Sequence, residues 1–258
     1  MAIADGRLEI VALEGIPEVV AGDDLPALLC AALERTKDLL PLRPDDVLVV
    51  TQKVVSKAEG AVVDLTTVTP RPEALEFASR FDKDARQVEV VLREAKRVVR
   101  MANGVIITET RHGFVCANGG IDASNVGPRS GSVVLLLPVD PDASAAQIRA
   151  TIAARFGVAV PVVISDSFGR PWRNGIVDVA IGAAGLEPLD DLRGSPDRDG
   201  RPMRSTVRAV ADELASAAEL VLGKSEGRPA AIVRGAHPPI GPGTGRDLIM
   251  PAESDLFR

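Results

Sequence analysis

Strand-like and helix-like patterns alternate along the whole chain without an internal repeat, so the chain must combine a sheet with the helices that cover it. Short apolar runs between turn residues predict strands at residues 8–13, 47–50, 105–108, 133–137, 160–164 and 230–233. Helical patterns occupy residues 24–40, 72–100 in one or two pieces, 144–156 and 205–222. Because no linker divides these elements, we expect one α/β domain over residues 1–258, which can contain two subdomains.

Local signals refine two parts of this prediction. Ser144, with Gln147 three residues later, has the spacing of a capping box and predicts a helix start after the turn at residues 140–142. Residues 190–202 are rich in Asp, Gly, Arg and Pro, and residues 237–246 are rich in Gly and Pro. Both stretches are predicted loops, and either is a candidate for a mobile lid.

Charge and composition argue against several classes of protein. The formal net charge of −6 disfavours a general nucleic-acid or membrane-surface binder, so a phosphate ligand needs local basic residues. The chain opens without a basic and apolar leader and has no segment that would span a bilayer. Cys30 and Cys116 lack metal-ligand spacing and are expected to be buried thiols. These features indicate a cytoplasmic protein.

Two segments carry the strongest chemical signal, residues 120–125 (GIDASN) and residues 164–175 (ISDSFGRPWRNG). Each surrounds an aspartate, Asp122 or Asp166, with hydroxyl, amide and glycine neighbours. Carboxylate and hydroxyl oxygens suit Mg²⁺ or Mn²⁺, and glycines let the backbone approach an anion that Arg170 and Arg173 can neutralise. The two segments therefore predict a site for a hard cation and a phosphate.

Each of these residues also has a plainer interpretation. A single aspartate at a strand end is more often a turn or helix-cap residue, and a lysine such as Lys57 is usually solvated. Arg170 and Arg173 can equally form structural salt bridges, because arginine binds carboxylates and phosphates alike. Trp172 suits a core as well as a site. His112 is expected to be packed or at the surface.

Familiar nucleotide-binding and catalytic motifs are absent from the sequence. Gly223-Lys224-Ser225 looks like the end of a P-loop, but Ala218 stands where that motif requires its first glycine. The glycine-rich residues 241–245 lack the preceding strand and the following helix of a dinucleotide fingerprint. The two histidines argue against a common zinc site, and no serine lies in a nucleophile elbow. The chemistry must therefore use carboxylates, amides and cations.

Several strings match one known family in order over nearly the whole chain, at residues 15–18 (GIPE), 54–60 (VVSKAEG), 120–125, 166–175, 223–224 (GK) and 233–235 (VRG). They resemble the coenzyme F420-0:γ-glutamyl ligase family. The resemblance implies a mixed α/β (α+β) fold of the γ-glutamyl-ligase type, with two intertwined subdomains and neither a P-loop nor an ATP-grasp architecture. It also implies an intertwined homodimer. Some actinobacterial relatives continue into a flavin-binding domain after an ending such as Leu256-Phe257-Arg258, so we expect a stand-alone ligase domain or one excised from a fusion.

The resemblance implies an enzyme that uses GTP and divalent cations. It would join the carboxylate of the phospholactyl tail of F420-0 to the α-amine of L-glutamate, and then add further glutamates to F420-1 through γ-linkages. Making an amide from a carboxylate requires activation, and transfer of the GTP γ-phosphoryl group gives an acyl phosphate that an amine can attack. Such a transfer depends on positioned metals and cations more than on a covalent nucleophile.

The resemblance also assigns roles to individual residues. The expected catalytic residues are Asp122, Asp166, Arg170 and Arg173. Two Mg²⁺ or Mn²⁺ ions per subunit are expected, with Asp122 and Asp166 on the first, Ser167 and Glu226 on the second, and K⁺ as a further candidate ion. The expected GTP site is lined by Ile16, Pro17, Glu18, Val19, Gln52, Lys57, Asn125, Lys224 and Ser225. Gln52 stands where relatives commonly carry Ser or Thr, so an amide replaces a hydroxyl there.

Two other classes of function stay open at this point. A metal-dependent nucleotide phosphohydrolase would use the same aspartates to position water, and it would release phosphate from GTP without glutamate or the deazaflavin. A non-catalytic nucleotide-binding protein would keep the fold without needing both Asp122 and Asp166.

Overall fold

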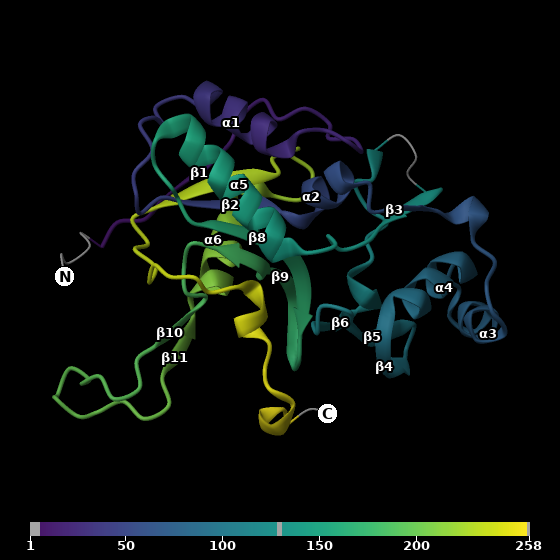
Figure 1. Cartoon of the computed structure of the whole chain (residues 1–258). Helices are drawn as coiled ribbons and strands as arrows, with labels where there is room; N and C mark the ends of the chain where they lie inside the picture. Colours follow the sequence, from purple (N-terminus) through teal and green to yellow (C-terminus); the bar gives the residue numbers. More distant parts are fainter. Residues whose placement is uncertain (1–5, 128–130, 257–258) are drawn as a thin grey trace.

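The computed structural model describes residues 6–127 and 131–256, and a five-stranded sheet forms its centre (Figure 1). In sheet order the strands are β1 (Glu9–Ala12), β12 (Ala230–Arg234), β2 (Val47–Thr51), β8 (Val162–Arg170) and β9 (Arg173–Ala184). β2 and β8 pair in parallel, and the other neighbours are antiparallel. The carboxyl ends of β2 and β8 therefore meet at one end of the sheet, where ligands commonly bind in sheets with parallel strands.

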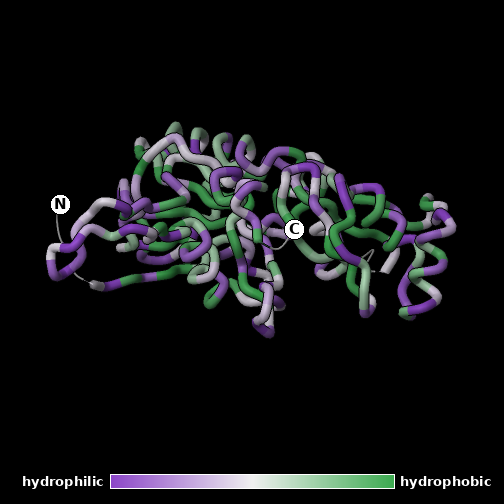
Figure 2. The backbone as a smooth tube through the Cα atoms, turned by 90° about the horizontal axis from the view of Figure 1, so that it is seen from below, coloured by the Kyte–Doolittle hydropathy of each residue, from purple (hydrophilic) through white to green (hydrophobic). Residues whose placement is uncertain are grey.

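Helices cover both faces of this sheet, because its central strands are apolar on both sides. α1 (Leu25–Arg35), α2 (Gln52–Glu59) and α5 (Pro141–Phe156) pack with Leu48 and Val50 on one face. α6 (Val210–Leu222) packs with Val47 and Val49 on the other face. Figure 1 shows α1 and α5 above the sheet and α6 below it, and Figure 2 shows apolar segments running through the middle of the molecule.

A second group of elements lies beside the sheet. It contains η1 (Leu65–Thr67), α3 (Pro72–Phe81), α4 (Ala85–Glu94), β4 (Ala95–Ala102), β5 (Val105–Thr110), β6 (Val115–Ala117) and η2 (Asn118–Gly120). α3, α4 and β5 enclose a small apolar cluster of their own. β3 (Val62–Asp64) pairs with β7 (Val133–Leu135), and a backbone bridge joins Asp122 to Leu135. This bridge fixes the backbone that carries Asp122.

The two stretches that were lid candidates lie elsewhere. β10 (Leu189–Asp191) and β11 (Val207–Ala209) form an antiparallel hairpin that projects from the molecule (Figure 1), and residues 190–202 belong to it. Residues 237–246 pack against residues 186–188 near β9 and lead into η4 (Gly245–Leu248) and η5 (Ala252–Ser254). Neither stretch contributes a described residue to the cavity below. The lid role of these stretches stays a prediction.

One helix start differs from the prediction because a stronger cap lies earlier in the chain. α5 begins at Pro141 and not at Ser144. The Asp140 side chain accepts a hydrogen bond from Ala143 N at 3.1 Å, and proline suits the first helical position. Ser144 donates instead to Glu59 Oε1 at 2.7 Å, which ties α5 to α2.

Other boundaries differ because strand pairing overrides local pattern. Residues 72–100 do contain two helices, but α4 ends at Glu94 and the chain continues as β4, which pairs with β5. The strand predicted at residues 160–164 extends as β8 to Arg170 and forms a long hairpin with β9. α1 ends at Arg35 and α6 begins at Val210, so both helices are shorter than predicted.

Several coarser predictions are confirmed. The fold is mixed α/β, and Cys30 and Cys116 are buried. His112 is half-buried, with Nε2 lying 2.9 Å from the carbonyl oxygen of Pro138. No described helix is both long and apolar enough to cross a membrane. The opening residues 1–5, and Phe257 and Arg258 of the ending, lie outside the described residues.

Candidate active site

A cavity of about 900 Å³ lies at the carboxyl ends of β2 and β8. Its lining comes from segments that are far apart in the sequence: residues 16–19, 51–57, 122–127, 165–167, 176–178, 222–225 and 227–229. They meet here because β2 and β8 are neighbours in the sheet and α2 follows β2 without a loop. The volume falls in the range of pockets that hold small-molecule ligands.

The first turn of α2 faces this cavity. Thr51, Gln52 and Lys53 line it, and the N-cap residue Thr51 makes no side-chain hydrogen bond to the helix backbone. The first N–H groups of a helix have no partners within the helix, and they carry the positive end of its dipole. This end of α2 therefore suits an anionic ligand such as a phosphate.

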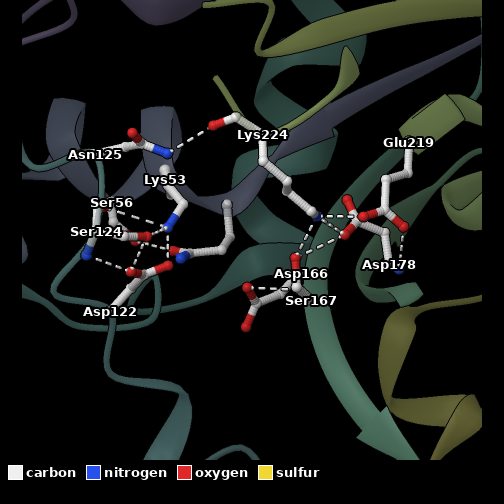
Figure 3. Close-up of polar contacts among 11 residues, drawn as sticks. Lys53, Ser56, Asp122, Ser124, Asn125, Asp166, Ser167, Asp178, Glu219 and Lys224 are labelled. Carbon is white, nitrogen blue, oxygen red and sulfur yellow. Dashed lines mark hydrogen bonds and ion pairs between the residues drawn. The ribbon is translucent and has the colours of Figure 1, made fainter. Parts of the chain in front are cut away.

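Lys53 holds the segment that carries Asp122 (Figure 3). Its ammonium forms a close ion pair with Asp122 Oδ2 and donates to Ser124 Oγ at 3.1 Å. Asp122 Oδ1 accepts hydrogen bonds from Ser124 N and Ser124 Oγ, both at 2.7 Å. Burial lowers the pKa of Lys53 to about 8, and the charge of Asp166 opposes that shift. Lys53 thus balances charge on both aspartates.

Asp166 lines the cavity from β8 and is half-buried. The surrounding protein atoms displace water from its carboxylate, although solvent still reaches part of the residue. This burial raises the pKa of Asp166 to about 7, against the opposing effects of a 2.8 Å hydrogen bond from Ser167 N and of the Lys53 charge. A raised pKa means that the ionised carboxylate has too little positive charge nearby, which is the condition that a bound cation relieves.

Hydroxyl and carboxylate groups surround the ammonium of Lys224 (Figure 3). Lys224 Nζ lies 2.7 Å from Ser167 Oγ and 2.8 Å from Asp178 Oδ1, and it also pairs with Glu219. Asp178 is 3% exposed and accepts hydrogen bonds from Ser167 Oγ at 2.7 Å and Ser165 Oγ at 3.2 Å. Burial lowers the pKa of Lys224, but its bonds to Asp178 and Glu219 outweigh burial, so the pKa is raised.

Two further pairs of side chains lie on the α2 side of the cavity. Ser56 Oγ donates to Gln52 Oε1 at 2.8 Å, and the buried Gln52 Nε2 has no hydrogen-bond partner in the part of the chain that the structure describes. Lys57 Nζ pairs with Glu18 Oε1 at 2.6 Å. Gln52 thus offers an unused donor to a ligand, and Lys57 offers a charged one.

The cavity brings together most of the residues predicted from the sequence: Ile16, Pro17, Glu18, Val19, Gln52, Lys57, Asp122, Asn125, Asp166, Ser167, Lys224 and Ser225. Their individual roles stay predictions. Arg170 and Arg173 lie at the far end of the β8–β9 hairpin and do not line it, and Arg170 donates to the carbonyl oxygen of Asn174 at 3.2 Å. Glu226 does not line it either, and its carboxylate accepts a hydrogen bond from Ser225 N at 2.8 Å.

Sequence patterns did not single out two residues that the structure places in the cavity, Lys53 and Asp178. Lys53 comes just after the apolar strand β2, and that position was a usable signal, because side chains beyond the carboxyl end of a central strand face the site. Asp178 stands between Val177 and Val179 in β9. A carboxylate within an apolar strand is costly to bury, which was the signal for a functional or paired charge.

The oxygen atoms of the cavity suit a hard divalent cation. Asp122, Asp166 and Ser167 supply carboxylate and hydroxyl oxygens, which Mg²⁺ and Mn²⁺ prefer. Within residues 6–127 and 131–256, no three acidic, histidine or cysteine side chains already converge on one ion position. Lys53 pairs with Asp122, and Lys224 bonds to Ser167. The donor chemistry therefore fits a cation, whose binding would displace these ammonium groups.

Comparison with known proteins finds one enzyme family over most of the chain. Residues 15–235 match the F420-0:Gamma-glutamyl ligase family. A relative from Methanothermobacter thermautotrophicus, named coenzyme F420:L-glutamate ligase, is 45% identical over 257 residues, which cover 97% of this chain and 99% of the relative. A relative of the same name from Methanocaldococcus jannaschii is 47% identical over 219 residues, covering 84% and 86%. Another from Methanopyrus kandleri is 45% identical over 261 residues, covering 98% and 100%.

Proposed function

Because the chain belongs to the F420-0:γ-glutamyl ligase family, we propose that it adds L-glutamate to the deazaflavin coenzyme F420-0 in a GTP-dependent step of coenzyme F420 biosynthesis. The first glutamate is joined through its α-amine, and later ones are γ-linked to F420-1. The observation that carries this proposal is that Asp122 and Asp166 share one cavity with Lys53, Lys57 and Lys224. Carboxylates and ammonium groups together are what transfer of a phosphoryl group requires.

The GTP phosphates fit the α2 side of this cavity. The N-terminus of α2 attracts anions, and Lys57 and Lys224 can form charge-assisted hydrogen bonds to phosphate oxygens. Gln52 Nε2 offers a further donor. This nucleotide site is neither a P-loop nor an ATP-grasp site. Residues 223–225 follow the end of α6, whereas a P-loop precedes a helix.

The proposed reaction activates a carboxylate before the amide forms. A carboxylate oxygen of the F420-0 tail attacks the γ-phosphorus of GTP, the bond from that phosphorus to the β,γ-bridging oxygen breaks, and GDP leaves. The amine of L-glutamate then attacks the acyl carbon, inorganic phosphate leaves, and the nitrogen loses a proton. The chain contributes by positioning the reactants and stabilising the negative charge.

Asp122 and Asp166 would hold the first of two Mg²⁺ or Mn²⁺ ions per subunit, and Ser167 would hold the second. Glu226 would join the second ion only after its carboxylate leaves Ser225 N, because it does not line the cavity in this structure. Bound divalent cations supply positive charge beside the phosphate oxygens. With a cation bound, the ammonium groups of Lys53 and Lys224 would be turned from Asp122 and Ser167 toward phosphate oxygens, while Lys224 keeps its pairs with Asp178 and Glu219. The proposal also includes K⁺ as a further ion, an intertwined homodimer with two subdomains per chain, and a cytoplasmic location. Arg170 and Arg173 are proposed as catalytic residues on the condition that the tip of the β8–β9 hairpin reaches the reactants, because neither arginine lines the cavity of the described chain.

Parallel measurement of product mass and phosphate release tests this function. The protein is incubated with F420-0, GTP, Mn²⁺ and L-glutamate, and each component is omitted in turn. We expect glutamylated product with near-stoichiometric GDP and phosphate, and little phosphate release without F420-0, because an acyl phosphate must be protected from water. Rapid GTP hydrolysis without F420-0 and without a mass gain would indicate a phosphohydrolase. GTP binding without any turnover would indicate a non-catalytic nucleotide-binding protein.

A further inference from the structure

We propose that Asp178 is a positioning residue that turns the Ser167 hydroxyl oxygen toward a bound divalent cation, an inference that rests on the proposed function. The two residues are cross-strand partners, because Ser167 of β8 lies directly opposite Asp178 of β9. Side chains of directly opposed residues stand on the same face of a sheet. Ser167 Oγ and Asp178 Oδ1 are 2.7 Å apart as a result.

The direction of this hydrogen bond is fixed by the chemistry of the two groups. An ionised carboxylate can only accept, so the single hydroxyl proton of Ser167 is donated to Asp178 Oδ1. The lone pairs of Ser167 Oγ are then available to a positive charge. Lys224 Nζ lies 2.7 Å from that oxygen and 2.8 Å from Asp178 Oδ1, so a positive charge already approaches Ser167 Oγ beside the carboxylate that takes its proton.

The Asp178 carboxylate is itself held so that it cannot turn away. Its Oδ2 accepts from Ser165 Oγ at 3.2 Å, its backbone N–H donates to Glu219 Oε2 at 3.0 Å, and its backbone carbonyl accepts from Ser216 Oγ at 2.7 Å. Asp178 as a whole is only 3% exposed to solvent. A partner held in this way orients a metal-binding group, and losing such a partner typically weakens metal affinity by about 10- to 100-fold.

Asp178→Asn tests this role by reversing the hydrogen bond. An asparagine at this position can donate from Nδ2 to Ser167 Oγ and so occupy the lone pair that the cation needs. In calorimetric titrations of the full chain with Mn²⁺ alone, we expect the dissociation constant to rise by about 10- to 100-fold. Ser216→Ala is the matched control, because it removes a bond to the backbone of Asp178 and leaves its side chain intact. We expect that control to stay within about twofold of wild type.

A double-mutant cycle separates orientation of Ser167 from a direct effect of the Asp178 charge. Ser167→Ala should weaken Mn²⁺ binding, and adding Asp178→Asn to it should change the affinity by no more than about twofold. Circular dichroism and thermal melting report whether each variant is folded. If Asp178→Asn does not fold, Ser165→Ala serves in its place, because it loosens the carboxylate and should weaken Mn²⁺ binding in the same direction.

The outcomes that overturn the inference are distinct from failure of the proposed function. A folded Asp178→Asn variant with wild-type Mn²⁺ affinity overturns the positioning role, and so does a full further loss in the Ser167→Ala background. Unchanged affinity in Ser165→Ala overturns it if Asp178→Asn is unfolded. A wild-type protein that binds no Mn²⁺ and forms no glutamylated product overturns the function and the inference together.

Discussion

Replacing Lys57 by Met tests whether the α2 side of the cavity binds phosphate. Lys57 Nζ lies 2.6 Å from Glu18 Oε1, and the side chain of Lys57 is 11% exposed whereas that of Glu18 is 58% exposed. An ion pair with so exposed a partner contributes at most about 1 kcal/mol, whereas a charge-assisted hydrogen bond to phosphate contributes about 1.5–3 kcal/mol. Lys57→Met should therefore raise the dissociation constant of a non-hydrolysable GTP analogue roughly 10- to 150-fold in calorimetric titrations.

Glu18→Gln is the matched variant, because it breaks the same ion pair from the other side. It frees the Lys57 ammonium from a competing carboxylate, so the analogue should bind as tightly as to wild type or up to about fivefold more tightly. Lys57→Met is thus expected to weaken binding of the analogue, whereas Glu18→Gln is expected to leave it unchanged or to strengthen it. Unchanged binding by Lys57→Met would make Lys57 an ordinary surface lysine. Equal losses in both variants would show that the pair only shapes the turn at residues 16–19.

Three further predictions concern Asp166, Glu89 and Gly182. Asp166→Asn removes a charge that a divalent cation needs and should abolish ligation without changing the circular dichroism spectrum; wild-type turnover would exclude Asp166 from the site. Hydrogen bonds from Arg71 lower the pKa of Glu89 from 4.5 to about 2, so the free energy of unfolding should fall as pH drops through that range. Glu89→Gln should flatten this fall in urea titrations, and an equally steep fall in the variant would refute the assignment. Gly182→Ala places a Cβ atom 2.6 Å from Pro141 of α5 and should lower the free energy of unfolding by about 1–3 kcal/mol. In Gly169→Ala the added Cβ meets nothing within 4 Å, so the loss should be less than about 0.5 kcal/mol. Equal losses in the two variants would contradict the packing argument.

Elements that bury apolar side chains were predictable from the sequence, and elements created by pairing with distant residues were not. β2 is buried along its apolar run, and its position followed directly from that pattern. β4 continues the helical pattern of α4 and carries several charges, and it is a strand because β5 pairs with it. β8 likewise extends beyond its apolar part to Arg170 because β9 pairs along it. The residues of one segment do not show which distant strand will pair with it.

The oxygen atoms of the candidate site were easier to predict than the groups that balance their charge. Asp122 and Asp166 stand among glycine and hydroxyl neighbours, a local pattern that is visible in the sequence. Asp178 stands between two valines and Lys53 stands between Gln52 and Val54, and their partners in the site come from other segments of the chain. Only the meeting of β2, β8 and β9 at one end of the sheet shows that these residues belong together.

Charge balance in the cavity explains why we assign metal ions to the proposed GTP site of a protein whose own net charge is −6. The described lining holds equal numbers of acidic and basic side chains, namely Glu18, Asp122, Asp166 and Asp178 against Lys53, Lys57, Lys224 and Arg228. A nucleoside triphosphate brings roughly four more negative charges to this nearly neutral site, where burial already raises the pKa of one carboxylate to about 7. Two divalent cations carry as much positive charge as the triphosphate carries negative charge. Metal and nucleotide entering together keep the cavity close to neutral, whereas either one alone leaves a large charge in a partly buried site.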